Sequence, residues 1–501
     1  MQPSPTKTFA RLRKLLLRGA GLLALLYLAL LIPGPTPVIS GGAGKAPFAW
    51  KQDPLWAELE SRFRESRAAG CPALAGQINQ ALQEGSRLLD GISGKTLEPD
   101  AGEFRVLESN VFQLAPLVAV CPQHLPDYAA LIFRTRAELK RQSRQWDMNS
   151  APARQRIYRL LFGGRIALEE AMLQSPSGTS ALELALCTDE PSRTPAVSVL
   201  GLPLHSGDIL VSRGGAPTSA LIARGNDYPG NFSHVALLHV DEKTGRASVV
   251  ESHIEKGVAV ASMDEYLQDK KLRIMALRLR ADLPALMADP LLPHTAAAAG
   301  LAEAKRRHIP YDFAMDSRNH DALFCSEVAA AAYEQAGVRL WMGVSFISSP
   351  VVTAWLGSLG VRHFETQEPA DLEYDPQLCV VAEWRDRTAL FKAHVDDAVT
   401  DAMLEEAGPG KPLDYPVPWL PLSRLAKAWS VVLNAVGKVG PIPEGMSATA
   451  ALRVKKYRAD HNALADRLLT VAEDFKKERG YVPPYWELLS LARQAIRNQE
   501  S

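Results

Sequence analysis

The chain has 501 residues, which is too long for one ordinary domain and predicts two to four folded units. With 47% hydrophobic and 22% charged residues, its composition is that of a globular protein. Lys plus Arg and Asp plus Glu are balanced at 56 each. No net positive field therefore points to nucleic acid, and we expect no nucleic-acid partner.

Residues 1–40 have the pattern of a signal peptide or a membrane anchor. The apolar run at residues 19–32 is nearer in length to a signal-peptide core than to the roughly 20 residues of a spanning helix. Residues 15–17 would lengthen it, and Val38 and Ser40 form a weak cleavage site. The basic residues before the run are Lys7, Arg11, Arg13, Lys14 and Arg18. This positive-inside bias predicts that the rest of the chain lies on the extracytoplasmic side of the inner membrane, either anchored or, after cleavage, periplasmic.

The number of cysteines is informative about disulfide formation in an exported chain and about the presence of a free thiol. The five cysteines are Cys71, Cys121, Cys187, Cys325 and Cys379. An odd number in an exported chain leaves at least one thiol unpaired within the chain, while four could form up to two disulfides. The sequence does not choose among the pairings.

Residues 50–185 are predicted to be a helical region. Segments such as "LAGQINQALQEGSRLLDGI" and "YAALIFRTRAELKRQSRQW" carry apolar residues at helical spacing with charges between them. None of these segments shows the spacing of a metal or catalytic site. A turn-rich linker, "CTDEPSRTPAVSVLGLPLHSGD", follows at residues 187–208.

Residues 200–388 are predicted to form a mixed α+β unit. Five short strand-like runs lie at residues 208–213, 233–240, 246–253, 257–262 and 272–279. A helix is expected around residues 294–307, a second begins at Cys325, and a last strand covers residues 378–385. The length of about 190 residues is that of an ordinary domain.

Helices are expected again in residues 390–501. The segment "VPWLPLSRLAKAW" carries Trp419, Leu420, Leu425 and Trp429 beside basic residues. Such a stripe packs into a core in most proteins, but it is also the pattern of a helix that lies on a membrane surface. The sequence leaves both interpretations open.

Cys325 is the candidate nucleophile. In "LFCSEVAAAAYEQAG" it stands at the predicted start of a helix that ends at Gly337. A helix N-terminus lowers the pKa of a thiol, and its free N–H groups can hold a developing oxyanion. A cysteine in this position is nevertheless more often a buried structural residue, so it needs a partner base to count as a nucleophile.

A predicted hairpin supplies that base. "NFSHVALLHV" and "RASVVESH" flank the turn "DEKTG". If the turn is centred between Lys243 and Thr244, Ala236 faces Glu251, and His234 shares one face of the sheet with Glu251 and His253. This face would offer an imidazole to accept the thiol proton and a second polar group to orient it.

These motifs together resemble the permuted papain-like amidases of the YaeF/YiiX type, which are related to NlpC-type cysteine hydrolases. The resemblance covers about residues 204–385 through "GDILVSRG", "FSHVALL", "VVESHIEKGVAVASMDEYL" and "IPYDFAMDSRNHDALFCSEVAAAAYEQAG". In the permuted group the histidine precedes the cysteine, as His234 precedes Cys325 here. The resemblance implies an antiparallel sheet and a nucleophile-bearing helix, here flanked by helical regions.

The resemblance also implies roles for individual residues. Cys325 would be the nucleophile, His234 the general base and Glu251 the orienting group, with His253 as the alternative third member. Tyr311 would line the site and bind substrate or the oxyanion. Asp208 is expected to be structural, and Glu327 is expected to cap or pair rather than to face the thiol.

The predicted function is that of an exported thiol hydrolase acting on an amide or ester bond at the cell envelope. A peptidoglycan peptide and a lipid acyl group remain alternative substrates, and acyl transfer to a lipid remains an alternative to hydrolysis. A membrane-tethered binding protein with an inactive papain-like module is the rival from another class. No cofactor is expected, and the local spacing of His234, Glu251, His253 and Cys325 fits no known metal motif.

Overall fold

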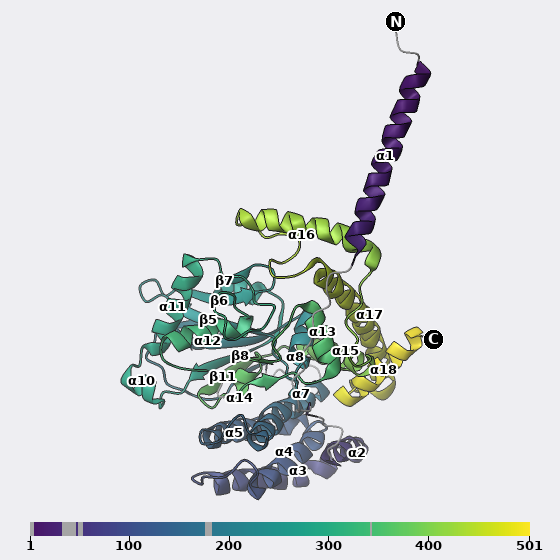
Figure 1. The fold of residues 1–501 in the computed structure, drawn as a ribbon. Coiled ribbons are helices and arrows are strands. Elements are labelled where there is room, and N and C mark those ends of the chain that lie inside the picture. Colours follow the sequence, from purple (N-terminus) through teal and green to yellow (C-terminus); the bar gives the residue numbers. More distant parts are fainter. Residues whose placement is uncertain (1–4, 33–46, 49–53, 176–182, 341–342, 501) are drawn as a thin grey trace.

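The computed structural model describes residues 5–32, 47–48, 54–175, 183–340 and 343–500. A sheet lies at the centre, with one group of helices below it and another beside it, and a single long helix projects from the body (Figure 1). The candidate cleavage residues Val38 and Ser40 lie outside the described residues.

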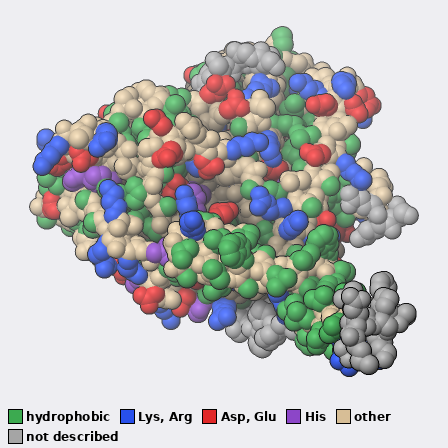
Figure 2. Space-filling view, turned by 90° about the horizontal axis from the view of Figure 1, so that it is seen from above, with side chains coloured by type: hydrophobic (Ala, Val, Ile, Leu, Met, Phe, Trp, Pro, Cys, Tyr) green, Lys and Arg blue, Asp and Glu red, His purple; other side chains and the backbone are tan. Residues whose placement is uncertain are grey.

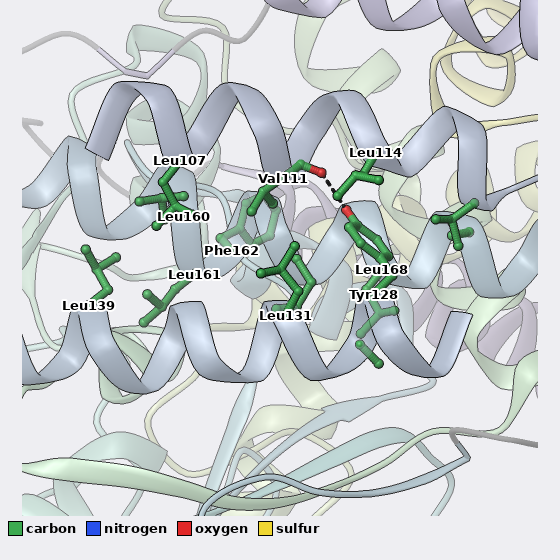
Figure 3. Close-up of a cluster of buried hydrophobic side chains, with 14 of the residues drawn as sticks. Leu107, Val111, Leu114, Tyr128, Leu131, Leu139, Leu160, Leu161, Phe162 and Leu168 are labelled. Atoms are coloured by element: carbon green, nitrogen blue, oxygen red, sulfur yellow. Dashed lines mark hydrogen bonds between the residues drawn. The ribbon is translucent and has the colours of Figure 1, made fainter. Parts of the chain in front are cut away.

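The N-terminal region folds as predicted into helices. A shared core joins them, in which the hydroxyl of Tyr128 donates to the carbonyl of Val111 at 2.9 Å (Figure 3). The helices are α2 (Pro54–Ala69), α3 (Cys71–Ile92), α4 (Gly102–Val118), α5 (Leu125–Ser143), α6 (Ala151–Ile157) and α7 (Gly164–Gln174), with a π-helical turn at Tyr158–Gly163.

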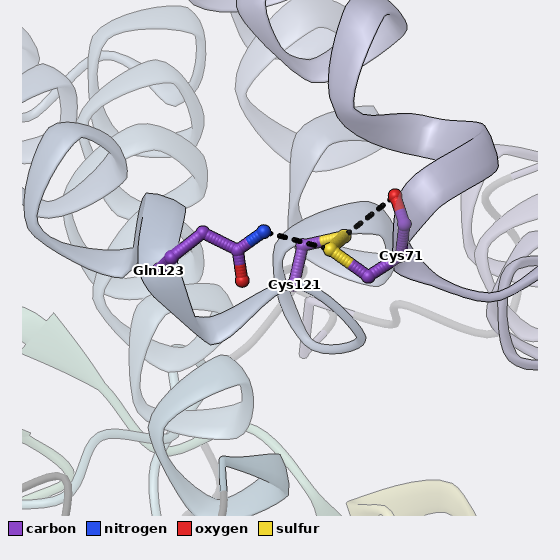
Figure 4. The surroundings of a disulfide bond; sticks show 3 residues. All are labelled: Cys71, Cys121 and Gln123. Atoms are coloured by element: carbon purple, nitrogen blue, oxygen red, sulfur yellow. Dashed lines mark hydrogen bonds between the residues drawn. A yellow bond between two sulfur atoms is a disulfide. The ribbon is translucent and has the colours of Figure 1, made fainter.

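One disulfide ties this region together. Cys71, the first residue of α3, is bonded to Cys121, which follows α4. The amide of Gln123 points at the Cys71 sulfur at 2.8 Å (Figure 4). All five cysteines lie in described segments, and Cys187, Cys325 and Cys379 are free thiols.

An antiparallel sheet forms the centre of the molecule. In the described ranges seven strands pair in the order β1-β11-β8-β4-β5-β6-β7, and every neighbouring pair is antiparallel. The strands are β1 (Leu184–Leu186), β4 (Ile209–Gly214), β5 (His234–Val240), β6 (Ala247–His253), β7 (Gly257–Ser262), β8 (Lys271–Leu279) and β11 (Leu378–Trp384). The six strand-like runs named from the sequence all belong to this sheet.

The parts of the chain that were predicted to be a helical region and a linker contain short strands that the sequence did not indicate. β1 pairs with β11 at the edge of the sheet, although it falls at the end of the predicted helical region. β2 (Ala196–Val199) and β3 (Leu202–His205) form a separate hairpin within the predicted linker. These runs of three or four residues are too short to show a period, and Pro203 within β3 argues against a strand.

Different elements cover the two faces of the sheet. α11 (Leu292–Arg306) and α12 (Cys325–Gln335) pack on the face that includes Val235 and Leu237. The β2–β3 hairpin and α9 (Met263–Gln268) pack on the face that includes Ala236. The remaining short elements are α8 (Pro217–Arg224), α10 (Pro284–Ala288), α13 (Pro350–Leu359), α14 (Asp371–Tyr374), β9 (Ser345–Phe346) and β10 (Glu365–Thr366).

The C-terminal region is helical, as predicted. It consists of α15 (Arg387–Glu406), α16 (Leu420–Ala435), α17 (Ala448–Arg479) and α18 (Tyr485–Glu500). In α16, Leu420 is buried, but Leu425 and Trp429 are each 57% exposed, and Trp419 just before the helix is 58% exposed. The interpretation of this stripe as core is therefore wrong, because only one side of α16 packs on the protein.

The long projecting helix is α1 (Pro5–Leu31). Its 27 residues extend about 40 Å at the rise of an α-helix. Lys14–Leu31 is long and apolar enough to cross a membrane, and none of this window is buried in the protein. By length and composition alone, the segment suits either a signal sequence or an anchor.

A buried ionic cluster joins α7 to the sheet. The Glu169 carboxylate lies 2.8 Å from Arg273 on β8, 3.4 Å from Arg165 and 3.6 Å from Arg385. Arg165 also pairs with Glu373 on α14 at 2.7 Å. Burial opposes ionisation of Glu169, but these cations hold its pKa well below the usual range. The charged form of this carboxylate therefore connects three parts of the fold.

Neutralising Glu169 should destabilise the protein. Because Glu169→Gln removes the carboxylate that pairs with the buried Arg273, we expect the free energy of unfolding to fall by about 3–5 kcal/mol. The matched control is Glu84→Gln, since Glu84 pairs with Arg87 on the surface at 2.8 Å, and its loss should cost less than about 1 kcal/mol. Urea unfolding of the full chain in detergent, followed by circular dichroism, measures both. Equal losses in the two variants would contradict the role assigned to the cluster.

Candidate active site

His234 is held by a carboxylate on the neighbouring strand. It is the first residue of β5, and its Nε2 lies 2.6 Å from Oε2 of Glu251 on β6. The contact follows from the strand register, in which Ala236 pairs with Glu251. This is the register predicted from the turn, so the placement of Glu251 on the His234 face is confirmed.

Glu251 is shared by two histidines. Its other oxygen, Oε1, lies 3.1 Å from Nε2 of His253, and the carboxylate is only 4% exposed. Burial opposes ionisation of Glu251, but the hydrogen bonds with the two imidazoles hold its pKa well below the usual range. An ionised carboxylate can only accept hydrogen bonds, so both Nε2 atoms donate. The Nδ1 of His234 is then left as the basic nitrogen.

His253 does not take the orienting position next to His234. The two imidazole rings lie 5.5 Å apart, centroid to centroid, and are joined through Glu251. Of the two alternatives for the third group, Glu251 is the one in contact with the His234 ring. His253 instead provides a second donor that keeps the carboxylate in place.

The His234 imidazole rests in its neutral form. Burial lowers its pKa below the usual value, while the hydrogen bond with Glu251 and its charge work in the opposite direction. At neutral pH the ring can therefore accept a proton. A general base must be in this form to act.

Cys325 is the first residue of α12, as predicted. The backbone N–H of Phe324 donates to Glu327 at 2.6 Å, which confirms that Glu327 caps the helix rather than facing the thiol. Cys325 is 2% exposed, and its Sγ lies 3.7 Å from the carbonyl oxygen of Ser233, the residue before His234. α12 packs on the opposite face of the sheet, but it begins at the end of β5, and this brings the thiol beside His234.

The pKa of the thiol is raised rather than lowered, contrary to the expectation from sequence, because other effects outweigh the helix start. Burial and the nearby Glu368 raise the pKa of Cys325 well above its ordinary value, although the backbone N–H groups of Val235 and Ser326 oppose the shift. The thiol is thus protonated at rest and bonded to the Ser233 carbonyl.

The predicted residues meet at one pocket. Cys325, His234, His253 and Tyr311 all line a cavity of about 470 Å³, and Glu251 lies behind the two histidines. Burial raises the pKa of Tyr311 well above its usual value, and the nearby Cys325 adds to the shift. The Tyr311 hydroxyl therefore stays protonated and can donate a hydrogen bond into the pocket.

Sequence reasoning missed the basic side of this pocket. Lys270, just before β8, and Lys271, its first residue, line it with Arg458 and Asn462 on α17. Lys271 pairs with Asp269, which lines the same pocket, at 2.7 Å. α17 lies more than a hundred residues after Cys325, in a helix whose charges look like those of any solvated surface. Nothing in the local sequence marks these side chains.

Asp208 has the structural role predicted for it. Its carboxylate accepts from the backbone N–H of His205 at 2.7 Å and pairs with Arg278 at 2.8 Å. No three His, Cys, Asp or Glu side chains in the described part of the chain are grouped so that they could hold a metal ion.

The domain around the pocket matches a known family. Residues 203–382 match the model of the permuted papain-like amidase enzymes of the YaeF/YiiX type, the C92 family. The central domain is similar to this family over these residues. The match agrees with the α+β fold and its antiparallel sheet, and it supports a cysteine hydrolase in general terms. Comparisons with curated proteins and with solved structures gave no match.

The state of the thiol can be tested by alkylation. Because burial raises the pKa of Cys325, its reaction with iodoacetamide in the folded protein should reach half its maximal rate at a higher pH than in the urea-unfolded chain. Peptide mass spectrometry follows the Cys325 peptide separately from those of Cys187 and Cys379. A lower midpoint in the folded protein would instead show a thiolate paired with an imidazolium at rest.

Proposed function

We propose that the protein is an exported cysteine hydrolase that cleaves an amide or ester bond with Cys325, His234 and Glu251. The observation that carries the proposal is that the Cys325 thiol and an imidazole oriented by a carboxylate line the same pocket. A structural cysteine or histidine would not require this combination. The family match supports the same reaction class.

The reaction would proceed through a thioester. His234 Nδ1 accepts the thiol proton as Sγ of Cys325 attacks the carbonyl carbon, and the imidazolium then gives that proton to the leaving amine or alcohol. Water, deprotonated by His234, attacks the thioester, and the acid leaves as Cys325 regains its proton. Glu251 holds the tautomer and stabilises the imidazolium. The first N–H groups of α12 and the Tyr311 hydroxyl would donate to the oxyanion.

Two features support a location outside the cytoplasm. The Cys71–Cys121 disulfide is typical of oxidising compartments. α1 carries its basic residues at its N-terminal end, and the positive-inside rule places that end in the cytoplasm. The domain at the other end of α1 then lies on the extracytoplasmic side of the membrane.

Substitution of the three proposed catalytic residues should separate their roles. With p-nitrophenyl acetate as a probe ester, Cys325→Ser should abolish p-nitrophenolate release. His234→Ala should lower kcat/KM by about 10²–10⁴-fold. Glu251→Gln should lower kcat/KM by a smaller factor, because His234 keeps its basic nitrogen and loses only its orienting partner. Release is followed by absorbance with the full chain in detergent.

His239→Ala is the matched control for these variants. His239 is on the same strand as His234 but stacks on His294, away from the pocket. Its substitution should leave ester cleavage within about twofold of wild type. Cleavage that survives Cys325→Ser would overturn Cys325 as the nucleophile, and wild-type protein that does not cleave the ester would favour a binding module.

A further inference from the structure

α16 presents a continuous apolar stripe to the outside. Leu422, Leu425, Trp429, Val432 and Val436 follow one another at spacings of three and four residues, which places them on one side of the helix axis. Their exposed fractions range from 54% to 66%. The opposite side packs on the protein. A soluble surface rarely carries an apolar stripe of this length without a partner.

α1 shows where that partner lies. Arg424 of α16 donates to the carbonyl oxygens of Leu30 at 2.9 Å and Ile32 at 2.6 Å, and the Tyr27 hydroxyl donates to the carbonyl of Pro418 at 3.0 Å. These bonds attach α16 to the end of the apolar helix. If Lys14–Leu31 crosses a bilayer, α16 lies at the level where the hydrocarbon ends.

The apolar stripe lies on the side of the molecule where a membrane surface would be. α16 runs across the foot of α1, and α1 rises from the same side of the molecule (Figure 1). Seen from that side, hydrophobic side chains form a band that reaches the foot of α1, and the surface beside the band is hollowed (Figure 2). Trp419 and Trp429 suit the headgroup level of a membrane that meets this side.

α16 is also coupled to the rim of the pocket. Lys427 donates to the carbonyls of Pro443 and Glu444, at 2.8 and 2.6 Å. The segment that follows Glu444 packs on Ile254 and Phe313. Phe313 in turn contacts Tyr311, which lines the pocket. α17, which contributes Arg458 and Asn462 to the pocket, packs along α16. A bilayer against α16 would therefore lie close to the pocket mouth.

We infer that α16 is an interfacial helix embedded in the leaflet where α1 ends, and that it presents the pocket to a membrane lipid. Resting on the proposed hydrolase function, this assigns the substrate as an acyl ester or amide of an anionic lipid. Lys270 and Arg458, which line the pocket, provide positive charge for the headgroup phosphate, whereas Lys271 pairs with Asp269 at 2.7 Å. The bond cleaved joins an acyl group to the lipid backbone, and the addition of water across it gives a fatty acid and the deacylated lipid.

The burial of the stripe can be measured directly. The full chain is reconstituted into vesicles of phosphatidylethanolamine and phosphatidylglycerol whose acyl chains are brominated. Tryptophan quenching should be weaker in Trp429→Phe than in wild type, because Trp429 lies in the leaflet. Unchanged quenching would overturn the inference. Self-cross-linking of Leu425→Cys across two chains, without quenching of Trp429, would assign the stripe to a second copy and also overturn it.

The substrate assignment has its own test, in vesicles of the same lipids without bromine. Leu425→Glu/Trp429→Glu should lower the release of fatty acid at least tenfold but leave cleavage of p-nitrophenyl acetate within twofold. The control Val106→Glu/Met287→Glu changes two apolar residues of similar exposure on α4 and α10 and should affect neither reaction. Cys325-dependent cleavage of the soluble ester, or of cell-wall peptides, without fatty acid release would overturn the lipid assignment and leave the hydrolase standing. If p-nitrophenyl acetate is not cleaved either, the proposed hydrolase activity itself would be contradicted.

Discussion

The hydrogen bond between Nε2 of His234 and the Glu251 carboxylate is the interaction on which the proposed chemistry depends. It exists because β5 and β6 pair with Ala236 opposite Glu251. A slip of one residue would move Glu251 to the other face of the sheet and leave His234 with neither a fixed tautomer nor a counter-charge. Apolar residues on both faces of β5 and β6 hold the register, since a slip would also exchange the two cores.

The proposed nucleophile, Cys325, reaches this pair from the opposite side of the sheet. α12 packs on the Val235 and Leu237 face, and only its first residue lies at the end of β5. The Cys325 thiol and the proposed base are therefore positioned by different elements of the same scaffold. The buried Glu169 cluster fixes the N-terminal helices on that scaffold, and α17 completes the pocket from the C-terminal side.

The parts of the site that depend on local pattern could be predicted from the sequence. The hairpin register followed from one turn, and the start of α12 from its helix-forming run and Gly337. The pKa of Cys325 could not be predicted, because burial outweighs the helix N-terminus and burial is set by tertiary packing. The same holds for Arg458, which enters the pocket from a distant helix, and for α16, whose pattern suits a core as well as a membrane.

The tautomer and charge of His234 test the account most directly. Nitrogen-15 NMR of histidine-labelled protein distinguishes the two neutral tautomers and the imidazolium, and the signal lost in His234→Ala identifies the residue. At pH 7 we predict a neutral ring protonated at Nε2 that titrates below the ordinary histidine pKa and loses its preference for this tautomer in Glu251→Gln. A neutral ring protonated at Nδ1, or an imidazolium at pH 7, would contradict the proposed general base.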